Sequence, residues 1–297
     1  MSVVITGGTG YLGTHLAMRL LNAHEDVHIV RRRGSSITQF PGLNIHFHED
    51  DGSANALIDI LERSKPTVVY HLAAHYIPAH EASDIPALVD GNILFGTRLF
   101  HAMAHTGCKT LVVVGTTWQH ISNENPAPAT LYAATKAGQE LIASYFIDAF
   151  GLSAAFVRIS DTYGPRDQRK KLFWFLRNAA LTGQPLAMSP GEQYLDMIYV
   201  EDAIEALCQA GAATQATKPG KANIWIAKAA RRYRLRDIVQ IWQNVTQYRL
   251  SVEWGARAYR PREVMQPWDA APGVPGWEPR VTLESGIRLM EEAYAQN

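Results

Sequence analysis

The sequence has little of three things that would point to particular classes of protein. Its only two cysteines among 297 residues, Cys108 and Cys208, lie in apolar contexts without a CxxC pair. We therefore expect packed thiols rather than a disulfide, and no metal site. Net charge is zero, since 28 Lys and Arg balance 28 Asp and Glu, which argues against nucleic acid or an anionic membrane as a partner. No apolar run approaches the roughly 20 residues that span a bilayer. The first residues enter a strand pattern without a basic segment or cleavage signal, so we expect no secretion signal. We expect a globular cytoplasmic protein.

The chain alternates short apolar runs with helical patterns over its first half. This alternation predicts an α/β fold with a doubly wound, parallel, Rossmann-type sheet. The predicted strands are residues 3–5, 27–30, 45–47, 67–70 and 109–114. After residue 165 the pattern changes, so residues 1–165, with 198–228 returning to them, are predicted to form a dinucleotide-binding domain. Residues 166–197 and 229–297 are predicted to form a smaller C-terminal α/β substrate lobe.

A glycine-rich turn, TGGTGYLG at residues 6–13, follows the first predicted strand and opens a helix. Gly7 permits a tight turn, Gly10 lets backbone N–H groups approach a pyrophosphate, and Gly13 allows close packing of helix on strand. The positive end of the helix dipole favours the same phosphates. We predict that a dinucleotide contacts Thr6, Gly7, Gly10, Tyr11, Leu12 and Gly13.

Arginines follow the second predicted strand, where an acidic residue would hold the ribose hydroxyls of NAD. A guanidinium there accommodates the 2′-phosphate of NADP with charge-assisted hydrogen bonds. We therefore predict NADP, as NADPH, with Arg31 or Arg32 as the phosphate ligand and Ser35 as its helper. A charged turn in solvent is the plainer reading of the same residues.

Tyr132 and Lys136 lie four residues apart at the head of an Ala-rich helix, and so share one face. The ordinary pKa of a tyrosine is about 10, and a nearby ammonium lowers it. Lowering it by roughly three units requires about 4 kcal/mol, which calls for a second positive charge such as a nicotinamide ring. The pair predicts a phenol that exchanges a proton with a substrate.

These motifs together resemble the extended short-chain dehydrogenase/reductase family, in its nucleotide-sugar epimerase, dehydratase and reductase branch. The matching segments are TGGTGYLG, HLAA at 71–74, YAATK at 132–136, RISDTYGPR at 158–166, DMIYVED at 196–202 and GWEP at 276–279. The resemblance implies that Thr116, Tyr132 and Lys136 are catalytic, with Thr117 competing with Thr116 for the hydroxyl role. Further cofactor contacts are expected at Asp50, which could accept from the adenine amino group, and at Asp51, Leu72, Ala73, Ala74 and Asn92.

The resemblance also predicts a nucleotide-diphosphate sugar as the substrate. It places a diphosphate-binding arginine at Arg260 or Arg262, with Arg260 the better match, and further contacts at Thr117, Asp161 and Lys171. Asp161 stands where relatives often carry Asn, and Leu195 where they often carry Arg. The basic loop 166–171 fits a solvated surface and a sugar-diphosphate contact equally well.

Dehydratases of this family need an acid and a base directly after the threonine, where this chain has Thr117 and Trp118. The pattern looks most like 4-ketosugar reductases of the CDP-abequose and CDP-paratose synthase type. These use NADPH to reduce the C4 keto group of a deoxysugar nucleotide. An NAD-dependent 4-epimerase, a reductase of a non-sugar carbonyl and a non-catalytic nucleotide-binding regulator are the alternatives. The nucleotide, the deoxysugar and the stereochemistry at C4 stay open.

Two predicted helices carry apolar residues on faces expected to be external, namely Phe95, Leu99, Leu141 and Tyr145. Relatives in the family pair these two helices across a dimer interface. The resemblance therefore predicts a homodimer.

Overall fold

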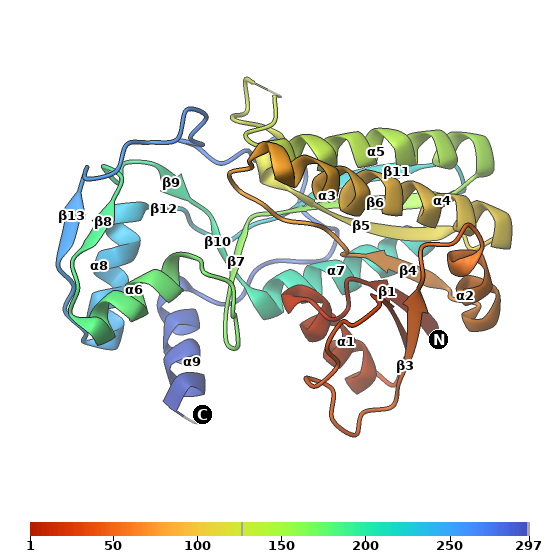
Figure 1. Cartoon of the computed structure of the whole chain (residues 1–297), viewed down its shortest axis with the longest axis horizontal. Helices are drawn as coiled ribbons and strands as arrows, with labels where there is room; N and C mark the ends of the chain where they lie inside the picture. Colours follow the sequence, from red (N-terminus) through yellow and green to blue (C-terminus); the bar gives the residue numbers. More distant parts are fainter. Residues whose placement is uncertain (126, 296–297) are drawn as a thin grey trace.

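A seven-stranded parallel sheet forms the larger part of the molecule (Figure 1). The computed structural model describes residues 1–125 and 127–295; residue 126 and residues 296–297, at the end of the predicted substrate lobe, lie outside the described residues. The strands are β1 Ser2–Thr6, β2 Asp26–Arg32, β3 Ile45–Asp50, β4 Val68–His71, β5 Thr110–Thr116, β6 Ser153–Ile159 and β11 Ala222–Ala227. Their spatial order, β11-β6-β5-β4-β1-β2-β3, confirms the predicted doubly wound α/β sheet.

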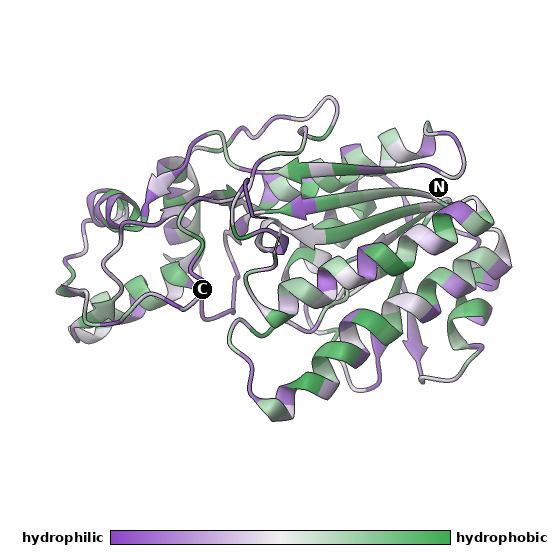
Figure 2. Cartoon of the chain, turned by 90° about the horizontal axis from the view of Figure 1, so that it is seen from above, coloured by the Kyte–Doolittle hydropathy of each residue, from purple (hydrophilic) through white to green (hydrophobic). Residues whose placement is uncertain are grey.

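Helices cover both faces of this sheet (Figure 2). On one face lie α1 Tyr11–Asn22 and α7 Val200–Gln215; on the other lie α2 Ala56–Ser64, α4 Phe95–Thr106 and α5 Leu131–Phe150. The alternation of side chains along β1 divides the core, because Val3 and Ile5 pack with α1 and α7 whereas Val4 packs with α2, α4 and α5. Burial on both faces explains why the strands read as continuous apolar runs.

The helix predicted from Asn92 to Ala104 is part of a longer helical run. It begins with the 3₁₀ turn η1 Ala82–Asp84 and α3 Ile85–Val89, continues through the π-helical turn η2 Asp90–Leu94, and ends as α4. Asn92 is buried within the π turn. Pro86 is accommodated because it occupies the first turn of α3, where a missing N–H costs no hydrogen bond.

A smaller set of elements packs around a third core at the other end of the molecule (Figure 1). Its elements are β7 Asp161–Tyr163, α6 Leu172–Thr182, β8 Leu186–Met188, β9 Tyr194–Leu195, β10 Met197–Tyr199, β12 Tyr233–Arg234, α8 Leu235–Thr246, β13 Val252–Trp254 and α9 Leu283–Ala295. Leu176, Trp242 and Ile287 are fully buried in this core. The segment 255–279 connects β13 to α9 as a long loop, as predicted.

The carboxyl ends of the sheet strands face this smaller region (Figure 2). The chain crosses from the sheet to the smaller core after β6 and returns through α7 and β11, which pairs with β6. We retain as a proposal the division into 1–165 with 198–228 and 166–197 with 229–297. Among the described residues, no helix combines the length and apolar character needed to cross a membrane. Cys108 and Cys208 are both free thiols.

Candidate active site

The glycine turn between β1 and α1 is built around close backbone contacts. Gly7 has φ +70°, and a Cβ there would lie 2.5 Å from the Ala73 nitrogen. A Cβ on Gly13 would lie 2.1 Å from the Gly7 carbonyl oxygen, so both positions exclude a side chain. Gly10 is more open, with the Gly7 oxygen 3.3 Å from its virtual Cβ, and it begins α1 without a side-chain cap. The first amides of α1 are therefore available to a phosphate, and the turn fits the dinucleotide that the sequence predicts.

The end of β4 is held against this turn by two polar side chains. Thr6 Oγ1 lies 2.6 Å from His71 Nδ1 and accepts a hydrogen bond from the Ala73 amide. Asn92 accepts from the His75 amide at 2.7 Å and donates to the His75 carbonyl oxygen at 3.0 Å and to Thr135 Oγ1 at 2.8 Å. The Asn92 amide thus shapes the 72–75 segment, with Leu72 and Ala73 half-buried and Ala74 exposed beside the turn.

The predicted 2′-phosphate site already contains a carboxylate. Arg31 Nη2 lies 3.4 Å from Glu49 Oε2 on β3, and Arg31 Nη1 donates to the Ser35 carbonyl oxygen at 3.2 Å. Arg32 is exposed at the end of β2, and Ser35 is half-buried. Glu49, on the neighbouring strand, therefore partly neutralises Arg31.

The two aspartates at the end of β3 are engaged in local structure. Both oxygens of Asp50 accept from Arg98, at 2.8 and 3.0 Å, and its side chain is 8% exposed. One of them also accepts from the Gly52 amide at 3.3 Å. Asp51 is exposed and accepts from the Ser53 amide. The bidentate pair with Arg98 ties β3 to α4 and occupies the oxygens that were expected to face adenine.

Tyr132 and Lys136 lie on α5 as the spacing predicts, but the predicted pKa shift is wrong for the free protein. Burial raises the pKa of the Tyr132 phenol, and the ring of Tyr76 packs edge-on at 5.0 Å. Lys136 does not counter this effect, because its Nζ donates to Gln139 Oε1 at 2.8 Å. Tyr132 is thus a protonated phenol at neutral pH.

Lys136 belongs to a buried chain of polar groups that the sequence analysis missed. Its side chain is 1% exposed, and burial lowers its pKa to about 8. Gln139 Nε2 donates to the Asn92 carbonyl oxygen at 2.5 Å and lies 2.9 Å from His71 Nε2. Since Gln139 presents its NH₂ group there, His71 Nε2 accepts and Nδ1–H faces Thr6. Burial keeps the pKa of His71 well below its usual range, so the ring is neutral.

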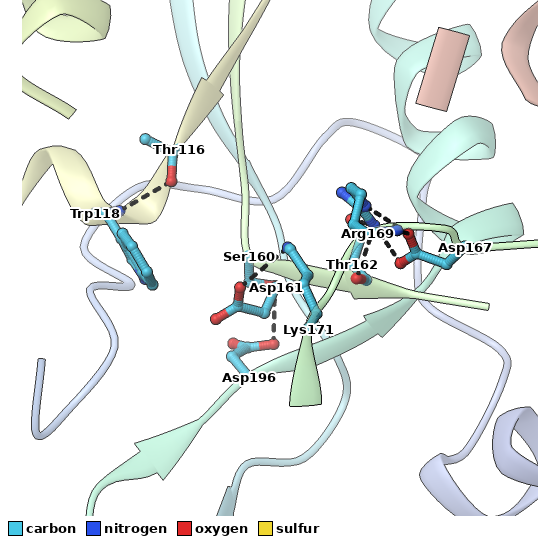
Figure 3. A network of polar contacts seen from close by, with 9 residues as sticks. All are labelled: Thr116, Trp118, Ser160, Asp161, Thr162, Asp167, Arg169, Lys171 and Asp196. Atoms are coloured by element: carbon cyan, nitrogen blue, oxygen red, sulfur yellow. Dashed lines mark hydrogen bonds and ion pairs between the residues drawn. The ribbon is translucent and has the colours of Figure 1, made fainter. Parts of the chain in front are cut away.

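A cavity of about 160 Å³ opens in front of Tyr132. Thr116, Thr117 and Trp118, from the end of β5 and the 3₁₀ turn η3 Thr117–Gln119, form one wall, and Leu12 forms another. Thr116 Oγ1 accepts from the Trp118 amide at 3.3 Å (Figure 3). Both threonines line the cavity, so the choice between them stays open.

A bridge of hydrogen bonds sets the position of Thr116 relative to α5. Gln119 Oε1 accepts from the Thr116 amide at 2.9 Å, and Gln119 Nε2 donates to Glu140 at 2.8 Å. Glu140 in turn pairs with Arg158 of β6 at 2.7 Å in a buried ion pair. Breaking such a pair leaves an uncompensated charge, so the network holds β5, β6 and α5 in one arrangement.

A second, larger cavity of about 520 Å³ continues towards the smaller core. It shares Thr117, Trp118, Ser160 and Asp161 with the first cavity. Arg260 lies on its wall with the guanidinium 5.5 Å from the Trp118 ring centroid. Arg262 also lines it, and its Nε donates to the Pro128 carbonyl oxygen. Arg260, the predicted diphosphate ligand, therefore lines the larger cavity, and Tyr132, the predicted proton donor, lines the smaller cavity that shares residues with it.

Polar residues on β7 and the loop that follows it line the smaller cavity. Figure 3 shows their mutual contacts. Asp161 Oδ1 lies 3.4 Å from Lys171 Nζ. Arg169, in the basic loop, is bound to Asp167 and to the Thr162 carbonyl oxygen, and it lies 4.3 Å over the Tyr11 ring. The loop is therefore an ordered wall of the cavity rather than solvated surface alone.

Asp196 lies below Asp161 in Figure 3, and both residues line the larger cavity. Asp196 is 2% exposed and accepts from Ser160 Oγ at 3.0 Å and the Ala229 amide at 2.7 Å, with Arg232 at 3.4 Å. Burial raises the pKa of its carboxyl above its ordinary value. The structure thus adds Tyr76, Gln139 and Arg169 to the site. Gln139 lies one turn after Lys136 on α5, whereas Tyr76 and Arg169 reach Tyr132 through tertiary folding that no local motif records.

The fold and the site place this chain among the extended short-chain dehydrogenase/reductases, which have a Rossmann-type sheet. The chain belongs to the NAD dependent epimerase/dehydratase family, whose model matches residues 3–225.

The proteins that this chain resembles are named for several different reactions. The chain is 25% identical to CDP-abequose synthase of Yersinia pseudotuberculosis over 70% of this chain and 72% of the relative. It is 24% identical to dTDP-glucose 4,6-dehydratase of Salmonella typhimurium over 100% of this chain and 93% of the relative. The fold superposes on UDP-glucose 4-epimerase of Thermotoga maritima, solved with UDP-glucose, with a TM-score of 0.86 at 21% identity, covering 100% and 99% of the two chains. MoeE5, solved with UDP-glucuronic acid and NAD, gives 0.82 at 25% identity with the same coverage.

Proposed function

We propose that the protein uses NADPH to reduce the C4 keto group of a nucleotide-activated 4-keto-6-deoxy or 3,6-dideoxy hexose. The observation that carries this proposal is the position of Tyr132, which lines a cavity that shares residues with the Arg260 pocket, and burial there raises the pKa of its phenol. A reductase needs a proton donor in its resting state, whereas oxidation of a sugar hydroxyl needs a base first. A phenol whose pKa is raised by burial fits the donor role.

The chain's own residues supply the proton and position the substrate. A bound reduced nicotinamide supplies the hydride for the carbonyl carbon. Tyr132 gives its phenolic proton to the oxygen of that carbonyl, which becomes the new hydroxyl, and Thr116 or Thr117 donates a hydrogen bond to the same oxygen. With the cofactor bound, Lys136 would hold the nicotinamide ribose and would favour the phenolate that remains. Arg260 binds the diphosphate as a guanidinium fork, with Asp161 and Lys171 facing the sugar.

Dehydration is disfavoured by the residues beside Tyr132. A dehydratase must move protons at two further sugar carbons, and Thr117 and Trp118 occupy the wall where an acid and a base would be needed. Neither side chain exchanges a proton near neutral pH.

A 4-epimerase using NAD is the second candidate, and one observation favours it. Glu49 neutralises Arg31 at the site expected to read the 2′-phosphate. Epimerisation would need no added reductant, and the protein would retain bound nicotinamide through purification.

A panel of substrates distinguishes these reactions. The protein is incubated with NADPH or NADH and with CDP-, dTDP-, UDP- and GDP-4-keto-deoxyhexoses, and loss of nicotinamide absorbance is followed. We expect oxidation of NADPH with at least one member of the panel. Turnover of a UDP-hexose without added nicotinamide would instead establish the epimerase.

Tyr132→Phe tests the proton donor directly. We expect kcat to fall by about 100- to 10,000-fold, because the general acid is lost. NADPH binding, measured by fluorescence titration, should change little since the phenol faces the substrate cavity. Undiminished turnover in this variant would refute the assignment.

We also propose that the protein is a homodimer formed through α4 and α5. Leu141 and Tyr145 on α5 are 74% and 61% exposed, as the dimer prediction requires. The prediction for α4 is partly wrong, because Leu99 is fully buried against the sheet and Phe95 is half-buried. Leu94, just before α4, is exposed instead.

A further inference from the structure

Four polar side chains meet on one face at the edge of the sheet, away from the active site. β2 and β3 run parallel with His28 opposite His46 and Val30 opposite His48. Residues two apart on a strand share a face, so Asp26 and His28 of β2 lie beside His46 and His48 of β3. The cluster lies at the start of β2, whereas the arginines expected to bind the cofactor lie at its end.

The nearest atoms in this cluster are the kinds that bind transition metals. His28 Nε2 lies 3.1 Å from Asp26 Oδ2, and His46 Nε2 lies 3.2 Å from Asp26 Oδ1. One ligand atom from each of the three residues lies within 4.8 Å of the other two. Tetrahedral zinc with bonds of about 2.0–2.2 Å holds its ligand atoms roughly 3.3–3.6 Å apart. Small side-chain movements would therefore complete three corners of a tetrahedron.

A fourth residue is placed to orient the central ligand. His28 Nδ1 lies 2.9 Å from His48 Nε2. Metal-binding histidines usually donate their second ring N–H to a neighbouring acceptor, which fixes the tautomer and presents the other nitrogen to the metal. The ring of His28 also stacks on that of His46, at 4.6 Å and 20°. His28 is thus held on both sides with Nε2 directed at Asp26.

Burial and access also suit a bound ion. The side chain of His28 is 10% exposed, which gives the site one buried anchor. The side chains of His46 and Asp26 are 50% and 52% exposed, which leaves an entry path and a fourth position for water.

We propose that Asp26, His28 and His46 bind one zinc-class divalent ion, with His48 as a positioning residue. Two imidazoles and one carboxylate form a ligand set typical of zinc. The ion would join β2 to the edge strand β3 and so stabilise the strand that carries Arg31.

Metal titration of the untagged, chelator-treated protein tests this site. We expect one equivalent of Zn²⁺ by calorimetry, a higher Tm with Zn²⁺, and the visible absorption of tetrahedral Co²⁺ when Co²⁺ replaces it. His46→Gln and Asp26→Asn each remove one exposed ligand without disturbing the core, and we expect each to weaken Zn²⁺ binding at least tenfold. His48→Gln should weaken it about 10- to 100-fold through His28.

His105→Gln is the matched control. His101 and His105 form another close histidine pair, on α4, with ring centroids 6.4 Å apart. This variant removes one histidine elsewhere, and Zn²⁺ affinity should not change. The proposal is overturned if the parent protein shows no saturable Zn²⁺ binding. It is equally overturned if binding survives His46→Gln and Asp26→Asn, or is lost in His105→Gln.

Discussion

The Lys136 amine is buried, and burial of its charged form destabilises the folded protein. Burial lowers its pKa from the ordinary 10.5 to about 8, with Gln139 as its hydrogen-bond partner. A shift of this size corresponds to roughly 3 kcal/mol of destabilisation while the amine is charged. A cofactor that draws the ammonium out of this position would relieve the cost on binding.

Lys136→Met should therefore change the pH dependence of stability. Below pH 8 the wild type bears the full cost of the buried charge. Between pH 8 and 10.5 the folded amine loses its proton while the unfolded one keeps it, so the free energy of unfolding of the wild type rises relative to the variant. Urea unfolding at pH 7.5 and pH 10 should show this relative gain, up to about 3 kcal/mol. A difference that stays constant over this range would mean that the folded and unfolded states bind this proton equally, so that burial does not lower the pKa of Lys136.

Glu49 reduces the positive charge that Arg31 would present to a 2′-phosphate. The pair is partly exposed, and such pairs contribute about 0–1 kcal/mol. We expect Glu49→Gln to lower KM for NADPH by up to about fivefold and to leave KM for NADH unchanged, as measured in steady-state assays. Glu62→Gln, on the exposed face of α2, is the control. An equal improvement with both nicotinamides would remove the 2′-phosphate from the explanation.

At the scale of elements, the sequence predicted the types of the main strands and helices, because the helices carry an apolar period and the strands are short continuous apolar runs. The π turn around Asn92 was not predicted, because the hydrophobic pattern continues through it and only its hydrogen bonds differ. The cluster of Asp26, His28 and His46 was also missed. Those residues come together only through the register of β2 against β3, which no spacing along one strand reveals.

The junction between α7 and the C-terminal segment depends on one carboxylate. Asp202, 7% exposed in the first turn of α7, accepts from the amides of Arg280 and Val281 at 3.0 and 2.8 Å. The Trp277 indole donates to the Asp202 carbonyl oxygen nearby. We expect Asp202→Ala to lower the free energy of unfolding by about 2–4 kcal/mol, because two partly buried amides lose a charged acceptor that is itself buried.

Glu201→Ala is the matched control for this prediction, since Glu201 is the exposed neighbour in the same turn. Its effect should stay within about 0.5 kcal/mol in chemical denaturation. Equal losses in the two variants would attribute the effect to charge near the helix N-terminus rather than to the anchored segment.

At the scale of the whole molecule, the sequence predicted both halves of the candidate site but not the link between them. The glycine turn and the Tyr132 helix carry local signatures, and the structure brings both to the strand ends. The connection of the Tyr132 cavity with the Arg260 pocket depends on how the 255–279 loop packs, and that loop has no period. The sequence also did not reveal the raised pKa of Tyr132, since this results from burial and from the nearby Tyr76.

The proposed dimer makes the last prediction, and it concerns the exposed apolar face of α5. Leu141 and Tyr145 are one turn apart on a helix that packs beside α4, so they form one patch in the monomer. Leu141→Asp combined with Tyr145→Asp places two charges in the predicted interface, and we expect sedimentation velocity to change from dimer to monomer. Leu181→Asp, at a 62% exposed leucine on α6, should leave the dimer intact. If the double variant stays dimeric, the subunits associate through another surface; if the wild type is monomeric, this apolar face has a different role.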